Sequence, residues 1–139
     1  MEYLLPALVA GLFVALSLLS RRDQVIRPDW EIDAEAAQLE PFRWGKLWVY
    51  DNDRNRSSTR PPLVFLHSMG ASMYSWRYQI DELKNETPLL AVDLLGFGRS
   101  SKPKNESYDL DAHAQRMIEL LDAKGIQQCY FVGCSLGGG

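Results

Sequence analysis

The chain has few of the residues that build metal centres, disulfide frameworks or nucleic-acid surfaces. It holds only two cysteines and two histidines in 139 residues. Cys129 and Cys134 lie close together on one apparent strand, where opposite parity directs them to opposite faces, so we expect no bridge between them. We therefore expect no metal and no other cofactor. A net charge of -3 argues against the clustered positive surface that a nucleic-acid partner requires, so we expect none.

The N-terminal segment lacks charge. Residues 3–20, "YLLPALVAGLFVALSLLS", are almost wholly apolar. At about 1.5 Å per residue such a helix is just long enough to cross a hydrocarbon core of roughly 30 Å, so we predict a membrane anchor in residues 1–20. A cleaved signal peptide is an alternative, although Glu2 stands where its positive charge belongs. A buried helix of a soluble domain is disfavoured, because no polar face exists to meet water.

Two signals bear on the side of the membrane. Arg21 and Arg22 follow the apolar segment at once, and the positive-inside rule places that end in the cytoplasm. We therefore expect the remaining chain on the cytoplasmic side, with export through a signal peptide as the alternative. The stretches "NRS", "NET" and "NES", at Asn55, Asn85 and Asn105, fit the N-glycosylation pattern and favour that alternative. The N-glycosylation pattern is short and occurs easily by chance, so we give the arginine pair more weight and expect the cytoplasmic side.

The rest of the chain divides at residue 41. Residues 21–40 are highly charged, and we interpret them as a linker. Residues 41–139 have the pattern of an α/β domain. "FRWGKLWVYD" predicts strand material, with a hairpin bent near Gly45. Continuous apolar runs predict three strands that are buried on both faces, at residues 63–67, 88–93 and 129–133.

Apolar residues at helical spacing follow the first two of these runs. They form one stripe of Trp76, Ile80 and Leu83, and another of Leu110, Ala114, Met117, Ile118 and Leu121. Asp109 and Gly125 are the expected N-cap and C-terminal stop of the second helix. His113 falls on the polar side of that helix, and we expect it at the surface. The order of elements predicts a mostly parallel sheet with flanking helices.

A polar loop, "NDRNRSSTRPP", separates the hairpin from the first buried strand. Its three arginines are interpreted as a solvated face. Anionic lipid headgroups are an alternative partner if the anchor is real.

The last buried strand runs into "GCSLGGG", where Gly133, Ser135 and Gly137 form the pattern G-x-S-x-G. Composition alone would give about 0.05 matches in a chain of this length, and the position at a strand end adds weight. A sharp turn from strand to helix would strain the serine backbone and expose its hydroxyl, and small neighbours allow such a turn. We hypothesise that Ser135 is a nucleophile and that the Leu136 amide donates to an oxyanion. An idle serine in a glycine-rich turn is the alternative.

Two other glycine-rich motifs are incomplete. Gly133 and Gly138 have the spacing of a phosphate-binding P-loop, but Gly139 replaces its lysine. A dinucleotide fingerprint starts at Gly96, but Ser101 stands where its last glycine belongs. Neither pattern predicts a nucleotide site.

The stretch "HSMGAS" after the first buried strand is a candidate source of a second amide donor. Acyl transfer needs two amides that converge on the developing oxyanion. Ser68 and Met69 lie where that donor would come from, and Gly70 would let the backbone approach. His67 stands at the strand end, where we expect it to brace its own turn rather than act as a base.

Three stretches in this order, "LVFLHSMGASMYSWRYQIDEL", "LLAVDLLGFGRSSKP" and "YFVGCSLGGG", resemble the α/β-hydrolase superfamily over residues 41–139. They are most similar to esterases, monoacylglycerol lipases and carbon–carbon bond hydrolases. The resemblance implies Ser135 as the nucleophile and the amides of Met69 and Leu136 as the oxyanion hole. The family's mostly structural D-x-x-G-x-G-x-S loop matches at Asp93, Gly96, Gly98 and Ser100. Haloalkane dehalogenases and epoxide hydrolases of this fold carry aspartate at the elbow, so the serine argues against those branches.

The sequence departs from the family in two respects. Ser68 stands where the family usually has glycine, which alters the expected shape of the oxyanion hole. The family also places its acid and then its histidine base after the serine, so we expect both beyond Gly139, in a longer protein. The 139-residue chain by itself should lack triad activity and leave its last strand as an uncovered, apolar sheet edge.

Together these features predict a membrane-anchored serine hydrolase, incomplete in this chain. Its substrate would be a small-molecule or lipid ester, cleaved through an acyl-enzyme on Ser135. The membrane would be its second partner, through residues 3–20. A non-catalytic binding or scaffold protein with the same fold is the alternative.

Overall fold

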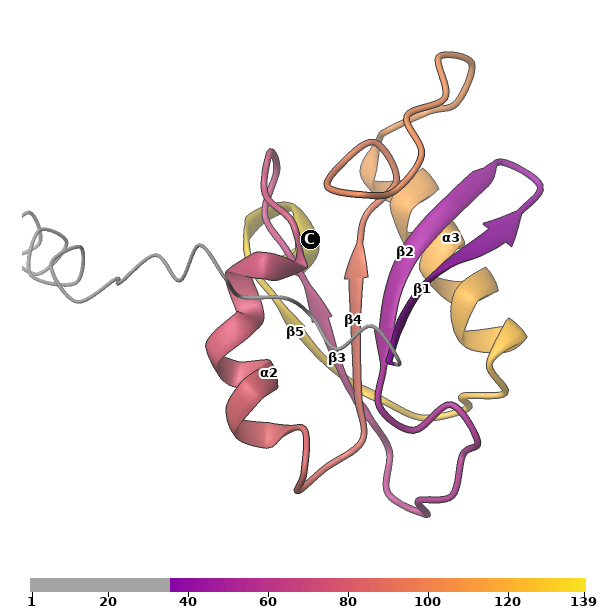
Figure 1. Ribbon diagram of the computed structural model, residues 1–139. Helices are drawn as coiled ribbons and strands as arrows, with labels where there is room; N and C mark the ends of the chain where they lie inside the picture. The colour runs from indigo at the N-terminus through magenta and orange to yellow at the C-terminus, as the bar shows by residue number, and fades with distance from the viewer. Residues whose placement is uncertain (1–35) are drawn as a thin grey trace, which may run out of the picture. The chain divides into compact units, whose positions relative to one another are not determined.

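The structure is a computed structural model that describes residues 36–139 (Figure 1). These residues form a five-stranded sheet in the order β1-β2-β4-β3-β5. The strands are β1 (Ala37–Phe42), β2 (Gly45–Asp51), β3 (Leu63–Leu66), β4 (Leu89–Asp93) and β5 (Tyr130–Gly133). The helical segments are η1 (Met73–Trp76), α2 (Arg77–Leu83), α3 (Leu110–Ala123) and η2 (Ser135–Gly138).

The sheet is mixed, which corrects the prediction of a mostly parallel one. Strand β3 pairs in parallel with β4 and β5, as expected for strands joined by helical crossovers. Strand β2 pairs antiparallel with both β1 and β4. The predicted hairpin accounts for the first antiparallel pair, because a tight turn can join only antiparallel neighbours. Gly45 opens β2 at the predicted bend, with φ +145°.

The two long helices cover opposite faces of the sheet, and β3 shows this most clearly. Val64 and Leu66 belong to the main core cluster together with Met117 and Leu120 of α3. Phe65 lies between them and therefore faces the other side, where its ring centroid is 5.2 Å from that of Trp76, just before α2. The continuous apolar run of β3 thus reflects a strand with cover on both faces.

The start and stop of α3 are confirmed, but its buried face is rotated from the predicted stripe. Asp109 caps the helix by accepting a hydrogen bond from the Ala112 amide at 2.7 Å, and Gly125 follows the helix with φ +66°. Leu110 and Ile118, which the stripe places inside, are each 51% exposed. The buried residues of the helix are His113, Arg116, Met117 and Leu120. The stripe missed this because the buried face includes two polar residues, His113 and Arg116, which a search for apolar spacing assigns to the solvent side.

Strand β5 is an edge strand whose outer residues are open. The sequence predicts burial on both faces, but Tyr130 is 62% exposed and Phe131 is 54% exposed. The reason is topological, since within residues 36–139 β5 lies at the end of the sheet and pairs with β3 alone. The expected uncovered, apolar edge is therefore present in this chain.

The hairpin begins earlier than the predicted domain start. Strand β1 starts at Ala37, within the segment 21–40 interpreted as a linker, because its backbone pairs with β2 from Tyr50 to Gly45. The predicted anchor and the rest of that linker lie outside the described residues. Within residues 36–139, no helix has both the length and the apolar character needed to cross a membrane.

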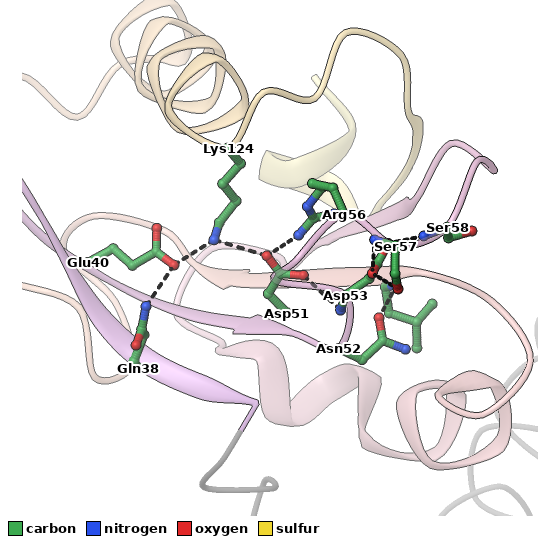
Figure 2. Close-up of polar contacts among 10 residues, drawn as sticks. Gln38, Glu40, Asp51, Asn52, Asp53, Arg56, Ser57, Ser58 and Lys124 are labelled. Carbon is green, nitrogen blue, oxygen red and sulfur yellow. Dashed lines mark hydrogen bonds and ion pairs between the residues drawn. The ribbon is translucent and has the colours of Figure 1, made fainter.

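A buried ion network ties the hairpin to the end of α3 (Figure 2). Lys124 Nζ lies 2.6 Å from Glu40 Oε1 and 3.0 Å from Asp51 Oδ2. Arg56 pairs with the same Asp51 carboxylate, which has no exposed side-chain surface. Each buried charge is thus matched by opposite charges, and losing one partner would leave another without compensation.

We expect Lys124→Met to lower the free energy of unfolding by about 3 kcal/mol, because it leaves the partly buried Glu40 carboxylate without a cation and the buried Asp51 carboxylate with Arg56 alone. Lys84→Met is the matched control. Its ammonium pairs with Asp81 in a bridge whose side chains are each 37% exposed, so the loss should be below about 1 kcal/mol. Urea-induced unfolding of both variants measures the difference. Equal losses would show that the buried network contributes no more than a surface pair.

Candidate active site

Three loops leave the same edge of the sheet. Strands β3, β4 and β5 run in parallel, so their carboxyl ends lie together, and ligand sites of open α/β sheets gather at that edge. The segment from His67 follows β3, the loop from Leu94 follows β4, and the turn at Ser135 follows β5. The sequence-predicted site residues all come from these three segments or from the strand ends that lead into them.

Ser135 occupies a strained backbone conformation at the turn after β5. Its φ is +51°, in the left-handed region that L-residues other than glycine rarely adopt. A Cβ on Gly133 would lie 1.9 Å from the Gly137 carbonyl oxygen, and one on Gly137 would lie 2.4 Å from the carbonyl oxygen of Leu66. Both positions therefore require glycine. The strained serine that the G-x-S-x-G pattern predicts is present.

Hydrogen bonds fix this turn against β3. The Cys134 amide donates to the Leu66 carbonyl at 3.2 Å, and the Gly137 amide donates to the Cys134 carbonyl at 3.0 Å. Leu136 follows Ser135 inside η2, a short 3-10 turn. Cys134, like Cys129, is a free thiol, as expected.

The predicted second amide lies on the loop after β3. Met69 is in a turn closed by the Ala71 amide, which donates to the Ser68 carbonyl at 3.1 Å. The Met69 side chain is 71% exposed, and Gly70 has φ +73°, which agrees with its expected turn role. Since β3 and β5 are paired neighbours, the Met69 turn and the Leu136 turn leave adjacent strands.

His67 braces the turn, as predicted. It is fully buried, and its Nε2 accepts a hydrogen bond from the Leu94 amide at 2.9 Å. Its Nδ1 lies 2.8 Å from the Ser68 carbonyl, to which it must donate because a carbonyl only accepts. Both ring nitrogens are therefore occupied, and His67 links the loops after β3 and β4.

Asp93 makes a second link between the same loops. Its carboxylate, in a residue that is 1% exposed, accepts from the Met73 amide at 2.6 Å and from the Arg99 amide at 2.8 Å. A Cβ on Gly98 would lie 2.0 Å from this carboxylate, and Gly98 has φ +50°. The resemblance to the family motif implies a structural role for Asp93. These contacts show what that role is, since the carboxylate joins the two loops.

The two remaining motif residues are Ser100 and Gly96. They fix the loop after β4 to the hairpin and to the stretch just before α3. Ser100 Oγ accepts from the Trp48 amide at 2.8 Å and donates to the Asp93 carbonyl. Gly96 has φ +91°, and a Cβ there would lie 2.6 Å from the ring of Tyr108. These contacts tie the loop to β2, to the end of β4 and to Tyr108.

His113 is buried, which corrects the prediction of a surface residue. It is 6% exposed, because the loop before α3 packs the rings of Phe97 and Tyr108 beside it, at centroid distances of 6.3 and 6.2 Å. The spacing of apolar residues along α3 indicates only which face of the helix is apolar. It could not predict that two rings from the preceding loop would cover His113. Burial lowers the pKa of His113 below its usual value, and the positive charge of Arg116 lowers it further.

His113 faces a cavity beside the serine turn. Its Nε2 is buried without a hydrogen-bond partner. The cavity has a volume of about 390 Å³, and its walls include Leu110, Phe131 and the residues from Leu136 to Gly139. Within residues 36–139, no hydrogen bond joins either histidine to the Ser135 hydroxyl.

Comparison with known proteins supports the assignment of the fold. A family model described as alpha/beta hydrolase fold matches residues 61–139. Epoxide hydrolase 4 of Mus musculus is 38% identical over 57% of this chain and 22% of its own length. Lipase 3 of Moraxella sp. (strain TA144) is 36% identical over 77% of this chain and 33% of its own length. The crystal structure of a bacterial membrane phospholipase A matches with a TM-score of 0.64 and 29% identity, over 97% of this chain and 42% of that one. The chain thus spans at most a third of the length of the two curated relatives, the epoxide hydrolase and the lipase.

We expect Ser135→Gly to raise the free energy of unfolding by about 1 kcal/mol, because glycine adopts a positive φ without strain. Ser135→Ala is the matched control, since alanine removes the hydroxyl but keeps the Cβ that causes the strain. Chemical denaturation measures both. No gain in the glycine variant over the alanine variant would contradict the assignment of strain.

We expect stability to fall as the pH drops below 6.5, through His113. In the unfolded chain this imidazole takes up a proton near its ordinary pKa of 6.5, whereas the folded state resists protonation until a lower pH. The unfolded state thus binds more protons in that window, and acid favours it. Unfolding measured from pH 7 to 5 should show a smaller slope in His113→Gln. An unchanged slope would remove His113 as the cause.

Proposed function

Because the chain belongs to the α/β-hydrolase fold family, we propose that the intact protein is a serine hydrolase that acts on carboxylic-ester-like substrates. The observation that carries this proposal is the backbone of Ser135, with φ +51° at the carboxyl edge of the sheet. Two glycines whose Cβ atoms would meet backbone oxygens accommodate the turn. A fold that maintains this strain presents the serine hydroxyl at the place where catalysis would use it.

The proposed chemistry begins with attack of Ser135 Oγ on the ester carbonyl carbon. The hydroxyl proton passes to a general base, and the carbonyl π electrons move onto the carbonyl oxygen. The amides of Met69 and Leu136 donate hydrogen bonds to this oxyanion. Collapse of the tetrahedral intermediate expels the alcohol and leaves an acyl-enzyme, which water then cleaves. The base and its orienting acid are assigned to the part of the protein that follows Ser135, in keeping with the family's chain order.

The substrate class is proposed from the serine and from the relatives. Similarity to a lipase and to a membrane phospholipase A favours lipid or other apolar esters. We do not propose epoxide opening from the similarity to an epoxide hydrolase. The resemblance implies aspartate at the elbow of that branch, and this chain has Ser135 there. A membrane anchor at residues 3–20 would keep the enzyme close to such substrates, and it forms part of the same proposal.

We expect Ser135→Ala in the full-length protein to lower kcat/KM for p-nitrophenyl butyrate by about a thousandfold or more, since the nucleophile is lost. The matched control is Ser58→Ala, in the loop between β2 and β3, which should hydrolyse the ester at the parental rate. Activity that survives in Ser135→Ala would contradict Ser135 as the nucleophile, and a parental protein without esterase activity would favour the non-catalytic alternative.

A further inference from the structure

A polar cavity lies at the edge of the sheet opposite to Ser135. Its volume is about 410 Å³. Its walls come from Ala36, from the end of β2 and the loop after it, and from Lys84 and Asn85 before β4. Strand β2 runs antiparallel to β4, with Asp51 beside Leu90, so the end of β2 lies next to the start of β4. The cavity is therefore at the amino edge of the parallel strands, away from the serine turn.

Two of the polar groups around this cavity already have partners within the protein. The Asp51 carboxylate is paired with Arg56 and Lys124 (Figure 2). Asn52 donates its amide to the carbonyls of Lys84 and Thr87, and its oxygen accepts from the Leu89 amide. These two side chains shape the cavity and have no need of a ligand.

Arg54 is different, because two of its three side-chain nitrogens lack acceptors. Its Nε and Nη2 are both buried without a hydrogen-bond partner. Among the ion pairs of residues 36–139, none includes this guanidinium. An arginine keeps its charge at any physiological pH, so it cannot relieve this burial by losing a proton. Buried donors of this kind are rare in folded proteins without a bound partner.

We propose that this cavity binds a phosphate-type oxyanion, with Arg54 as its principal ligand. A guanidinium presents two parallel donors that match two oxygens of a phosphate group. Lys84, whose ammonium pairs with Asp81, also lines the cavity, and Asn55 and Asn85 add amide groups. The cavity has room for more than a bare ion, since a water molecule occupies only about 30 Å³ of liquid. The site therefore fits a phosphate carried on a larger group as well as free phosphate.

The position of the cavity favours the headgroup of an anionic phospholipid over free phosphate. Ala36 lines the cavity, and the chain that leads from residues 3–20 enters the described part of the fold there. An anionic headgroup bound here would add an electrostatic contact with lipid to the proposed anchor in residues 3–20, and the preference for a lipid source rests on that proposed anchor.

The test is a calorimetric titration of the full-length protein in an uncharged detergent. One arm adds sodium phosphate at constant ionic strength, and the other adds micelles doped with phosphatidic acid, with phosphatidylcholine micelles as the blank. We expect saturable binding in the doped-micelle arm. Arg54→Gln should weaken it by at least about tenfold, and Arg54→Lys should fall between, because it keeps the charge and loses the paired donors.

Arg60→Gln is the matched control. It removes the same charge from the same loop, but its guanidinium already donates to the Glu86 carbonyl, and it lies outside the cavity wall. The affinity of the Arg60→Gln variant for the doped micelles should stay within about twofold of the parental value. All variants must first match the parent in circular dichroism and melting temperature; if Arg54→Gln fails this check, Arg54→Lys carries the comparison.

The results of the two titration arms either support or overturn the proposed oxyanion site. Binding of the doped micelles, with or without binding of free phosphate, supports the site with a lipid source, and binding of free phosphate alone supports the site with a soluble source. Absence of saturable binding in both arms overturns the proposal, as does an equal loss in Arg54→Gln and Arg60→Gln. The result is independent of esterase activity, because Ser135 lies at the other edge of the sheet and Ser135→Ala should bind as the parent does.

Discussion

The close approach of two backbones at the carboxyl edge of the sheet determines how Ser135 is presented. The turn after β5 packs against the last carbonyl of β3 so tightly that any side chain at Gly137 would lie within van der Waals overlap of the Leu66 oxygen. A second glycine, Gly133, removes the same conflict inside the turn. The serine between them is left with a positive φ. The Cys134 amide ties the turn to β3, and the Gly137 amide closes it by donating to the Cys134 carbonyl. The parallel pairing of β3 and β5 is thus the source of the strain.

The loops around the serine are held by buried polar side chains as well as by apolar packing. His67 and Asp93 stand at the ends of adjacent strands. Each bonds to the backbone of the loop that follows its own strand and to the backbone of the loop that follows the neighbouring strand. Such buried polar links specify one arrangement, because breaking them leaves unsatisfied groups in a dry interior. A second polar system, the network around Lys124, does the same for the hairpin at the other end of α3.

Local signals predicted the parts of the fold that depend on neighbours in sequence. The hairpin at Gly45, the cap at Asp109 and the strained turn at Ser135 follow from residues within a few positions of each other. The buried face of α3 and the exposure of β5 depend on which distant elements pack against them, and a helical period or an apolar run carries no such information. His113 shows this most clearly, since its cover comes from Phe97 and Tyr108 in a loop without a regular pattern. The unpaired guanidinium of Arg54 was hidden for the same reason, because its sequence context is that of a solvated loop.

The most direct test of the central claim is to label the full-length protein with a fluorophosphonate ester and locate the adduct by peptide mass spectrometry. Such a reagent phosphonylates a serine that is activated by a base and faces oxyanion donors, and it leaves ordinary serines unmodified. The account predicts one modified residue, Ser135, and no labelling after denaturation. Labelling at another serine, or a protein with measured esterase activity in which Ser135 stays unmodified, would contradict it.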